Sequence, residues 1–194
     1  MNIMTNEYVA IYEQSLIAQG PLETIVRETM ARGDGIEPIV LEIESCKRIE
    51  IEWHGDPDTV LARLHGHSDS ARGKRGRPKL GVKSKEVTLL PRHWEWLATQ
   101  RGGASVTLRR LVDAAMKNAT AEERISMKQN QLYSLLSVFA DAPGFEEAAR
   151  AMYRNSRIGY EKAISPWPED IKVLLLQKFD DIAAIHQGKD SEAS

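Results

Sequence analysis

The sequence predicts an α+β fold with four parts in order: a small ββαββ domain, a basic linker, a two-helix module and a C-terminal helical domain. Apolar and polar residues alternate in residues 39–44 and 49–53, as they do in strands. From Pro91 onward the apolar residues recur three and four positions apart, as they do in helices. Between these regions, residues 68–85 have little apolar content and are rich in Gly, Ser, Lys and Arg. The expected boundaries of the four parts are 7–65, 68–85, 86–118 and 120–187.

The composition is that of a soluble globular protein. Of 194 residues, 42% are hydrophobic and 28% are charged, and no apolar run is long enough to span a membrane. The N-terminus lacks the basic segment and apolar core that direct export, so we expect a cytoplasmic protein without membrane contact. Cys46 is the single cysteine, which excludes an intrachain disulfide and fits a reducing compartment. We interpret it as an incidental residue in a hairpin turn.

Charge is distributed unevenly along the chain. Residues 72–117 contain 12 Lys and Arg against 3 Asp and Glu, whereas the whole chain has a formal net charge of −2. The rest of the chain is therefore acidic. A basic segment in an otherwise acidic protein favours contact with a polyanion, and we expect that polyanion to be double-stranded DNA.

The N-terminal domain is expected to begin with a hairpin and a helix. Residues 8–18 alternate loosely around Gln14-Ser15, which is typical of a β-hairpin. Pro21 suits the first turn of a helix, and Gly33-Asp34-Gly35 would end it. The apolar residues between them have helical spacing: Leu22, Ile25, Val26 and Met30.

A second hairpin should complete the sheet. Its strands place three apolar residues each on one face (Ile39, Leu41 and Ile43; Ile49, Ile51 and Trp53) and four glutamates on the other (Glu42, Glu44, Glu50 and Glu52). We expect the helix to cover the apolar face of the sheet and the acidic face to be exposed to solvent. A divalent-cation site on the acidic face and docking of the basic arm there are alternative hypotheses. The pair His65 and His67 lacks further residues at ligand spacing, so we expect no metal site.

A short motif stands inside the basic linker. Lys74 to Lys79 reads KRGRPK, and its RGRP core resembles an AT-hook. The glycine lets the backbone enter a narrow groove, the proline keeps the chain extended, and a narrow A·T minor groove attracts arginine. The DNA-binding residues expected here are Arg75, Gly76, Arg77, Pro78, Lys79 and Lys83.

The two-helix module resembles the ribbon-helix-helix module of the MetJ and Arc repressors. Val87-Thr88-Leu89 has β character, Pro91 begins a helix, Gly102-Gly103 ends it, and Ser105 is the expected N-cap of a second amphipathic helix. The resemblance implies an obligate dimer whose paired strands enter the major groove, while the second helix presents its first N–H groups to a phosphate. The residues implied in DNA contact are Lys85, Glu86, Thr88, Ala104, Ser105, Val106, Arg109 and Arg110. Two rivals stay open: a helix-turn-helix with residues 106–117 in the groove, and a purely structural helical hairpin.

The C-terminal region should consist of packed helices. Thr120 to Glu123 forms a capping box for a helix over residues 121–140, and a second helix follows Pro143-Gly144 as residues 145–155. A short helix carries residues 158–164, and a last one runs from Glu169 to about His186. We find here no nucleophile with a base and no phosphate-binding loop, so we expect no enzyme activity and no cofactor.

Nearly the whole chain resembles a bacterial family known as domain of unknown function 2239. The phrases that carry the resemblance are IAQGPLETIV, IEIEWHGDPDTVLARL, GRPKLGVKSKEVTLLPRHWEWLATQRGGASVTLRRLVDAA, PGFEEAARAMY and WPEDIKVLLLQKF. The family name implies no activity. From the arm and the module we expect a dimeric transcription regulator that binds A·T-rich DNA. The alternative is a scaffold or antitoxin-like protein whose C-terminal helices bind a protein partner, and a small-molecule effector fits either function.

Overall fold

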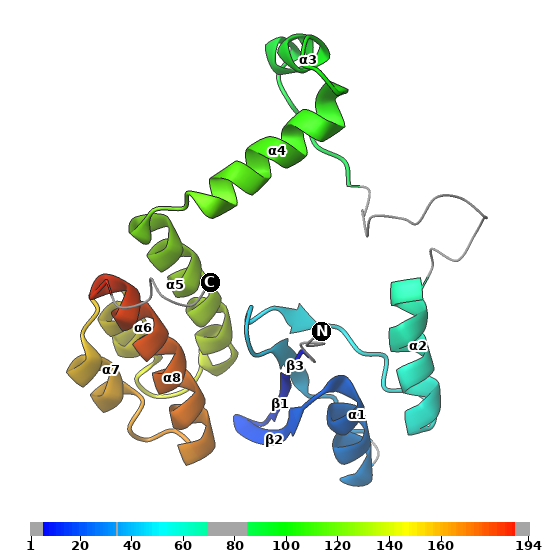
Figure 1. The fold of residues 1–194 in the computed structure, drawn as a ribbon. Helices are drawn as coiled ribbons and strands as arrows, with labels where there is room; N and C mark the ends of the chain where they lie inside the picture. Colours follow the sequence, from blue (N-terminus) through cyan, green and yellow to red (C-terminus); the bar gives the residue numbers. More distant parts are fainter. Residues whose placement is uncertain (1–5, 34, 70–84, 189–194) are drawn as a thin grey trace. The chain divides into compact units, whose positions relative to one another are not determined.

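The computed structural model describes residues 6–33, 35–69 and 85–188 (Figure 1). Strands β1 (Tyr8–Tyr12), β2 (Ser15–Gly20), β3 (Ile39–Glu42) and β4 (Arg48–Ile49) form an antiparallel sheet in the order β2-β1-β3-β4. Helix α1 (Leu22–Ala31) connects β2 to β3, and α2 (Pro57–Asp69) follows the sheet. The rest of the described chain is helical. The α+β class predicted from the sequence is confirmed.

The helical part contains α3 (Pro91–Ala98), α4 (Gly103–Lys117), α5 (Ala121–Leu136), a short 3₁₀ helix (Ser137–Phe139), α6 (Phe145–Tyr153), α7 (Arg157–Ala163) and α8 (Glu169–His186). The chain divides into two compact units. Unit 1 combines residues 1–71 with residues 121–194, and unit 2 covers residues 72–120. In the part of the chain that the structure describes, no helix is long and apolar enough to cross a membrane.

The first hairpin forms where the alternation predicted it. Glu13 and Gln14 connect β1 to β2 with left-handed φ angles of 47° and 62°. Two left-handed residues in a two-residue connection match the right-handed twist of the strands on either side. The turn lies one residue before the expected Gln14-Ser15 pair, and α1 follows at Leu22, with Pro21 extended as its N-cap.

Both faces of the sheet are covered, which the sequence analysis did not expect. The adjacent residues Val40 and Leu41 are 1% and 3% exposed. Val40 packs with Ala10, Ala18 and Ile25 on the α1 side, whereas Leu41 belongs to the main core with residues of α5, α6, α7 and α8. The N-terminal sheet and the C-terminal helices therefore share one core. The expected ranges 7–65 and 120–187 are parts of a single unit, because an apolar sheet face needs a second layer.

The register of β4 overturns the predicted acidic face. Val40 lies opposite Ile49, and Leu41 lies opposite Arg48. Ile49 thus shares a face with Val40 and packs on the α1 side, whereas Ile39 packs against the main core. The expectation that the two apolar sets share one face was wrong, as was that of four glutamates on the opposite face. The cation-site and arm-docking hypotheses lose their basis with that shared face.

Close packing positions α6 against α7 and α8. Gly144 has a left-handed φ of 88°, and a Cβ added to it would lie 2.2 Å from the carbonyl oxygen of Ala163. Only glycine fits there without displacing backbone. Trp167 stacks on Phe139 at 5.0 Å between ring centroids, and its indole N–H donates to the carbonyl of Pro143 at 2.7 Å. The connection Pro166-Trp167-Pro168 between α7 and α8 is thus a packed corner of the core.

Candidate nucleic-acid interface

The two-helix module is built by a proline start and a glycine turn. Pro91 occupies the beginning of α3, and Leu90 before it is extended, with φ −66° and ψ 150°. Gly102 is the N-cap of α4 with a left-handed φ of 92°, and a Cβ there would lie 3.1 Å from a methyl carbon of Val106. The expected N-cap role of Ser105 is wrong. It is the third residue of α4, because the helix begins at Gly103 directly after the left-handed residue.

The segment before α3 forms neither helix nor strand in the single chain. Residues 85–90, where the sequence predicts a short strand, have no regular secondary structure. Lys85, Glu86 and Thr88 are exposed, and Val87 is 55% exposed. A strand needs a partner for its backbone N–H and C=O groups, and the single chain offers none to these residues within its described part. The predicted ribbon stays a prediction.

The residues predicted to contact phosphate lie together at the start of α4. Ala104 is partly buried, Ser105 and Val106 are exposed, and the N–H groups of a first helical turn have no acceptor within the helix. Arg109 lies one turn further along and donates from Nε to the carbonyl of Ser105 at 3.1 Å. Arg110 is exposed beside it. A helix N-terminus with guanidinium groups one turn away is an arrangement that attracts anions.

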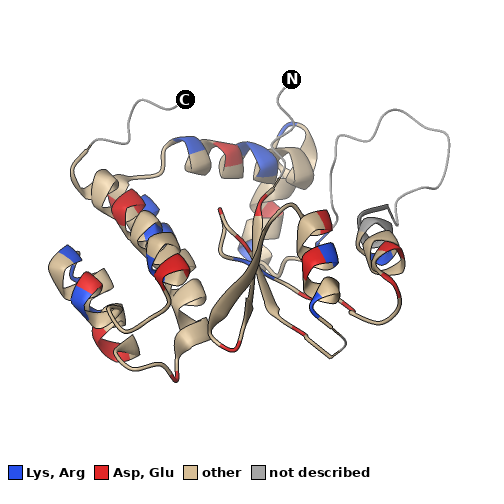
Figure 2. Cartoon of the chain, turned by 90° about the horizontal axis from the view of Figure 1, so that it is seen from below, with Lys and Arg blue, Asp and Glu red and all other residues tan. Residues whose placement is uncertain are grey.

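The cations of the module differ from many of those in unit 1. Among the described residues, Arg101, Arg109, Arg110 and Lys117 form no ion pair, and a single carboxylate, Asp113, lies among the charges of α4 (Figure 2). In unit 1 seven cations are paired with carboxylates: Arg27, Arg48, Lys128, Arg150, Arg157, Lys172 and Lys178. The described carboxylates therefore form no ion pair with these four cations of the module.

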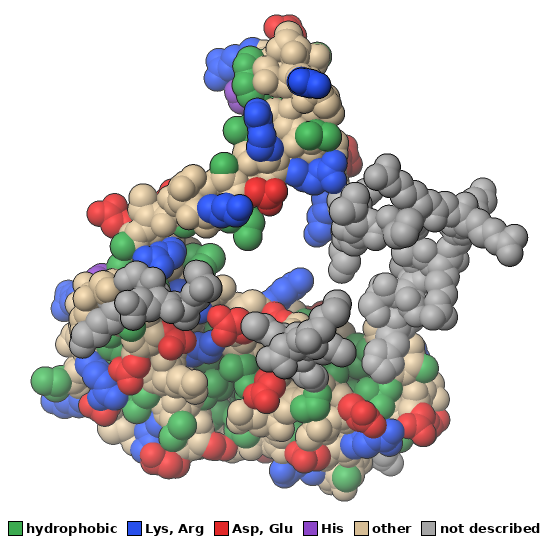
Figure 3. All heavy atoms as spheres, viewed as in Figure 1, with side chains coloured by type: hydrophobic (Ala, Val, Ile, Leu, Met, Phe, Trp, Pro, Cys, Tyr) green, Lys and Arg blue, Asp and Glu red, His purple; other side chains and the backbone are tan. Residues whose placement is uncertain are grey.

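The module also carries an uncovered apolar surface, which we call the open face. It is seen as hydrophobic side chains among the basic ones on α3 and α4 (Figure 3). In the described part of the module only Leu97 and Thr107 are fully buried. A small apolar cavity of about 240 Å³ opens between the two helices, lined by Leu89, His93 and Trp96 among others. The exposed apolar residues of the open face are Val87, Leu90, Trp94, Trp96, Leu111, Val112 and Met116.

The open face is the feature that periodicity alone missed. The apolar stripes predicted along α3 and α4 do form, but Trp94 is 44% exposed and Val112 is 54% exposed. Helical spacing shows which residues lie on one side of a helix, and it does not show whether the same chain covers that side. The expected arm residues Arg75, Gly76, Arg77, Pro78, Lys79 and Lys83 lie outside the described residues, as do the side chains of His65 and His67.

Unit 1 contains a charged contact between the sheet and the helices. The carboxylate of Glu44, in the turn after β3, lies 3.0 Å from Nζ of Lys128 on α5 and 3.6 Å from Nζ of Lys178 on α8. A hydrogen bond from Lys128 and the charge of Lys178 lower the pKa of Glu44 below its ordinary value. Cys46 is buried beside this contact, and burial raises the pKa of its thiol. Among the described residues, no three His, Cys, Asp or Glu side chains converge in a way that could hold a metal ion.

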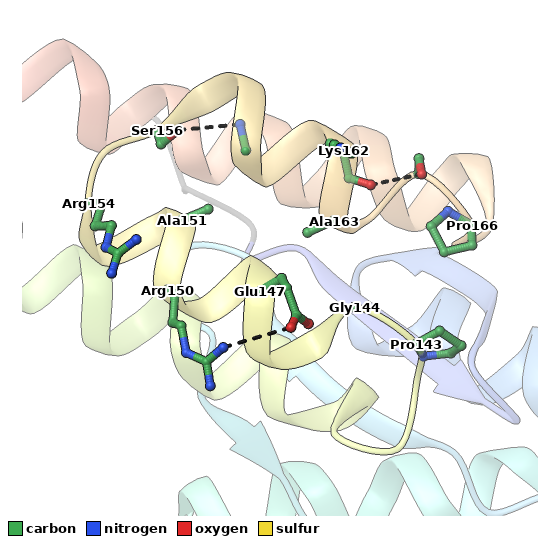
Figure 4. Close-up of a pocket in the computed structure, with 12 residues that line it drawn as sticks. Pro143, Gly144, Glu147, Arg150, Ala151, Arg154, Ser156, Lys162, Ala163 and Pro166 are labelled. Atoms are coloured by element: carbon green, nitrogen blue, oxygen red, sulfur yellow. Dashed lines mark hydrogen bonds and ion pairs between the residues drawn. The ribbon is translucent and has the colours of Figure 1, made fainter.

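A hollow of about 740 Å³ is an open groove between α6 and α7 (Figure 4). Its floor consists of small residues such as Ala151 and Gly159, because the two helices cross closely there. Arg150 on its edge is turned toward Glu147, with 3.8 Å between their charged atoms (Figure 4). The groove has no nucleophile paired with a base. The groove is therefore a polar depression of the surface, and its residues indicate no catalytic role.

The comparison with protein families matches the chain over residues 7–178 to the model described as an uncharacterized protein conserved in bacteria, DUF2239. The chain belongs to this family. The match covers the sheet, the basic linker, the two-helix module and the helices up to Lys178 within α8. No curated protein and no solved structure matches the chain.

Proposed function

We propose that this DUF2239 protein is a dimeric DNA-binding regulator of transcription that acts through the two-helix module and the basic arm. The observation that carries the proposal is that two features, unpaired cations and exposed apolar side chains, occur in the same short stretch of chain. Residues 85–117 combine unpaired cations with the open face, whereas the cations of unit 1 named above are paired and its core is closed. A surface that needs both an apolar partner and an anionic partner fits a dimer on a nucleic acid.

A second copy of the chain is the apolar partner in this proposal. A segment of about 35 residues buries too little surface to be stable alone, and units below roughly 40 residues are usually stabilised by oligomerisation or cross-links. The stretch at residues 86–90 has strand-forming residues and unpaired backbone, which a twofold-related copy would pair in an antiparallel ribbon. Pairing would bring the open faces of α3 and α4 of both chains into one core, as the ribbon-helix-helix resemblance implies.

DNA is the anionic partner. In the paired ribbon, the exposed side chains of Lys85, Glu86 and Thr88 would face the major groove, where a carboxylate accepts a hydrogen bond from cytosine N4. The first N–H groups of α4, at Ala104, Ser105 and Val106, would bind a backbone phosphate, with Arg109 and Arg110 beside it. The arm with Arg75 and Arg77 would enter an adjacent A·T-rich minor groove.

The test is a DNA-binding titration followed by fluorescence anisotropy on A·T-rich and G·C-rich duplexes of equal length. We expect tighter binding to the A·T-rich duplex and an affinity that falls steeply with salt, since each neutralised phosphate contributes a slope of about −0.9 to log K against log [salt]. Replacing Arg75 and Arg77 with alanine should remove most of the A·T preference. Replacing Arg109 and Arg110 with alanine should weaken binding to both duplexes by about tenfold or more and flatten the salt slope.

A matched control separates specific contacts from loss of charge. Arg154 is an exposed cation of unit 1 that forms no ion pair within the described chain, so Arg154→Ala removes one positive charge at an unrelated position. It should bind both duplexes as the parent protein does. Equal affinities of the parent and the Arg109→Ala/Arg110→Ala variant for DNA, or an effect of Arg154→Ala as large as theirs, would reject the proposal.

A second candidate function, binding of a protein partner by the C-terminal helices, is favoured by one surface. Tyr133 on α5 and Tyr153 on α6 are 40% and 50% exposed, and the Tyr133 ring lies 6.2 Å from both Phe145 and Tyr153. Exposed aromatic groups of this kind are typical of interfaces. A protein that co-purifies in equal amount with the parent and is lost from Tyr133→Ser/Tyr153→Ser, while DNA affinity is unchanged, would favour this function.

A further inference from the structure

A cavity of about 620 Å³ lies between the turn after β3 and helix α5. Cavities that bind small molecules usually measure roughly 300–1,000 Å³ and often lie where two parts of a fold meet. Here the N-terminal sheet meets the C-terminal helices. We call this cavity the α5 groove. Its walls are Ser45, Cys46 and Lys47 from the turn, and Glu123, Ser126, Met127, Asn130, Gln131 and Ser134 from the helix.

The helix wall is one face of α5 that consists mainly of hydroxyl and amide side chains, with Glu123 and Met127 among them. Its positions are spaced by three and four residues, which places them in one stripe along α5. The opposite stripe of the same helix contains Leu132, Leu135 and Leu136, all buried in the main core. The α5 groove thus has a polar wall fixed from behind by a packed apolar one.

Four hydrogen-bonding groups around the groove are uncommitted. Among the described residues, the side chains of Lys47, Ser126, Asn130 and Gln131 take part in no hydrogen bond or ion pair. Oε1 of Gln131 is moreover shielded from solvent without a partner. A shielded polar atom without a partner costs about 1–3 kcal/mol. The terminal torsion of glutamine is soft, so the amide can turn toward a ligand in the groove.

The chemistry of the walls selects a ligand class. The charged residues that line the groove are Lys47 and Glu123, so its lining has no net formal charge, which favours a neutral molecule over an anion or a cation. An amide offers both a donor and an acceptor, as two neighbouring hydroxyl groups of a sugar do. The thioether of Met127, 51% exposed, offers an apolar surface to the C–H face of a sugar ring. We propose that the α5 groove binds a neutral monosaccharide.

The groove is held in shape before any ligand enters. Glu44, next to the turn wall, is bound by Lys128 from α5 and Lys178 from α8. Cys46 between the walls is 3% exposed and belongs to the main core. Binding to such a preformed site loses little conformational entropy, which favours affinity for a small ligand.

The position of the groove on α5 assigns the sugar a role as effector, and this part rests on the proposed function. Only residues 118–120 separate α5 from α4, so a ligand on α5 acts on the helix that is joined directly to the DNA-binding module. A ligand that binds the DNA-competent form with a different affinity shifts DNA binding by the same factor.

Isothermal titration calorimetry on the full-length protein without DNA tests the binding. The probes are glucose, galactose, mannose and ribose, with glucose 6-phosphate and gluconate as charged analogues and adenosine as a neutral nucleoside. We expect at least one neutral sugar to bind and its charged analogue to bind more weakly. No binding of any of the four sugars, tighter binding of a charged analogue, or binding of adenosine alone would overturn the proposal.

Variants locate the site. Asn130→Ala and Gln131→Ala should each weaken sugar binding by about tenfold, which corresponds to the loss of about 1.4 kcal/mol. Gln129→Ala is the matched control, since it removes an amide of the same helix that does not line the groove. Lys47→Ala tests the opposite wall, and thermal unfolding checks that each variant is folded. Sugar binding that is unchanged in folded Asn130→Ala, Gln131→Ala and Lys47→Ala contradicts the site.

DNA titration with and without the sugar separates the two proposals. We expect the sugar to change the DNA affinity of the parent by about fivefold or more, and we expect Gln131→Ala to need about tenfold more sugar for the same change. A sugar that binds in the calorimeter but leaves DNA affinity unchanged contradicts the effector role alone. A protein that binds sugar and no DNA contradicts the proposed function, and the sugar site stands.

Discussion

At the scale of single residues, Glu44 is the carboxylate whose surroundings matter most for unit 1. It joins the turn after β3 to α5 and α8, and both lysine contacts lower its pKa. A carboxyl whose pKa is lower in the folded protein contributes stability that is present above its unfolded pKa, about 4.3. That contribution is lost as the pH falls through the lower, folded pKa. The Glu44 side chain is 81% exposed, so solvent screens the contact and its contribution is about 1 kcal/mol or less.

The first prediction therefore concerns Glu44→Gln. The variant should be less stable than the parent by up to about 1 kcal/mol at pH 7, and the difference should shrink as the pH falls from about 4.3 through the lower, folded pKa of Glu44. Urea unfolding at pH 7 and at pH 3.5 measures it. Glu52→Gln, an exposed carboxylate without an ion pair in the described chain, should match the parent at both pH values. A difference between Glu44→Gln and the parent that persists at pH 3.5 contradicts the charge-based account.

A second residue-scale prediction concerns Cys46. Its side chain is 3% exposed, and burial raises the pKa of the thiol, so both access and the thiolate fraction are low. The native protein should react with a thiol-specific disulfide reagent at pH 8 far more slowly than the protein in urea. Fast reaction of the native protein at the rate of an exposed thiol would show that the turn opens readily. The interpretation of Cys46 from sequence as a turn residue was right about the turn but could not show its place in the main core.

At the scale of elements, local patterns predicted the helices well and the sheet less well. Helical spacing and the proline and glycine positions gave α1, α3 and the C-terminal helices, because those signals act within a few residues. The predicted orientation of β4 was wrong. Alternation defines the two faces within one strand, but it does not show which face of the next strand lies on the same side of the sheet. The prediction of Ser105 as the N-cap was wrong because the left-handed Gly102 is the N-cap, three residues earlier in the chain.

The glycine turn before α6 gives a prediction for element packing. In Gly144→Ala the new Cβ would meet the Ala163 carbonyl oxygen at 2.2 Å, in addition to the strain of a φ of 88°. Gly35 has nearly the same φ, 87°, with nothing within 4 Å of the added atom. Gly35→Ala should cost about 1–2 kcal/mol from backbone strain alone. Gly144→Ala should cost more, about 3 kcal/mol or above, by chemical denaturation; equal costs would show that the α6–α7 contact adapts freely.

At the scale of the whole molecule, two features lay beyond local sequence patterns. The N-terminal sheet and the C-terminal helices share a core because both faces of β3 are apolar, and contacts between residues more than 80 apart, such as Glu44 with Lys128, leave no periodic signal. The cavity beside α5 is similar: Ser126, Asn130 and Ser134 share one helical face in the sequence, but only the opposing turn makes that face a wall. The basic segment, by contrast, was evident from composition, because it depends on charge alone.

The open face of the module gives the prediction that separates assembly from DNA binding. If a second copy covers this face, the parent protein should have close to twice the 21.8 kDa mass of one chain in light-scattering measurements. Val112 is 54% exposed in the single chain, so Val112→Asp leaves the chain's own packing intact and should instead separate the dimer and abolish DNA binding. Ala114→Asp adds the same charge to another exposed side of α4 and should remain dimeric.

Arg109→Ala completes this set, because it should keep the dimer mass and lose DNA affinity. Arg109→Ala would then lose DNA binding without loss of the dimer. We expect this separation because an apolar surface joins the two chains, whereas a cationic surface joins them to DNA. A parent protein that is monomeric at micromolar concentration and still binds DNA would favour the helix-turn-helix hypothesis, since that arrangement places residues 106–117 in the groove without a paired ribbon. In that case substitutions at Glu86 and Thr88 should leave the preference among DNA sequences unchanged, whereas substitutions on the exposed side of α4 should alter it.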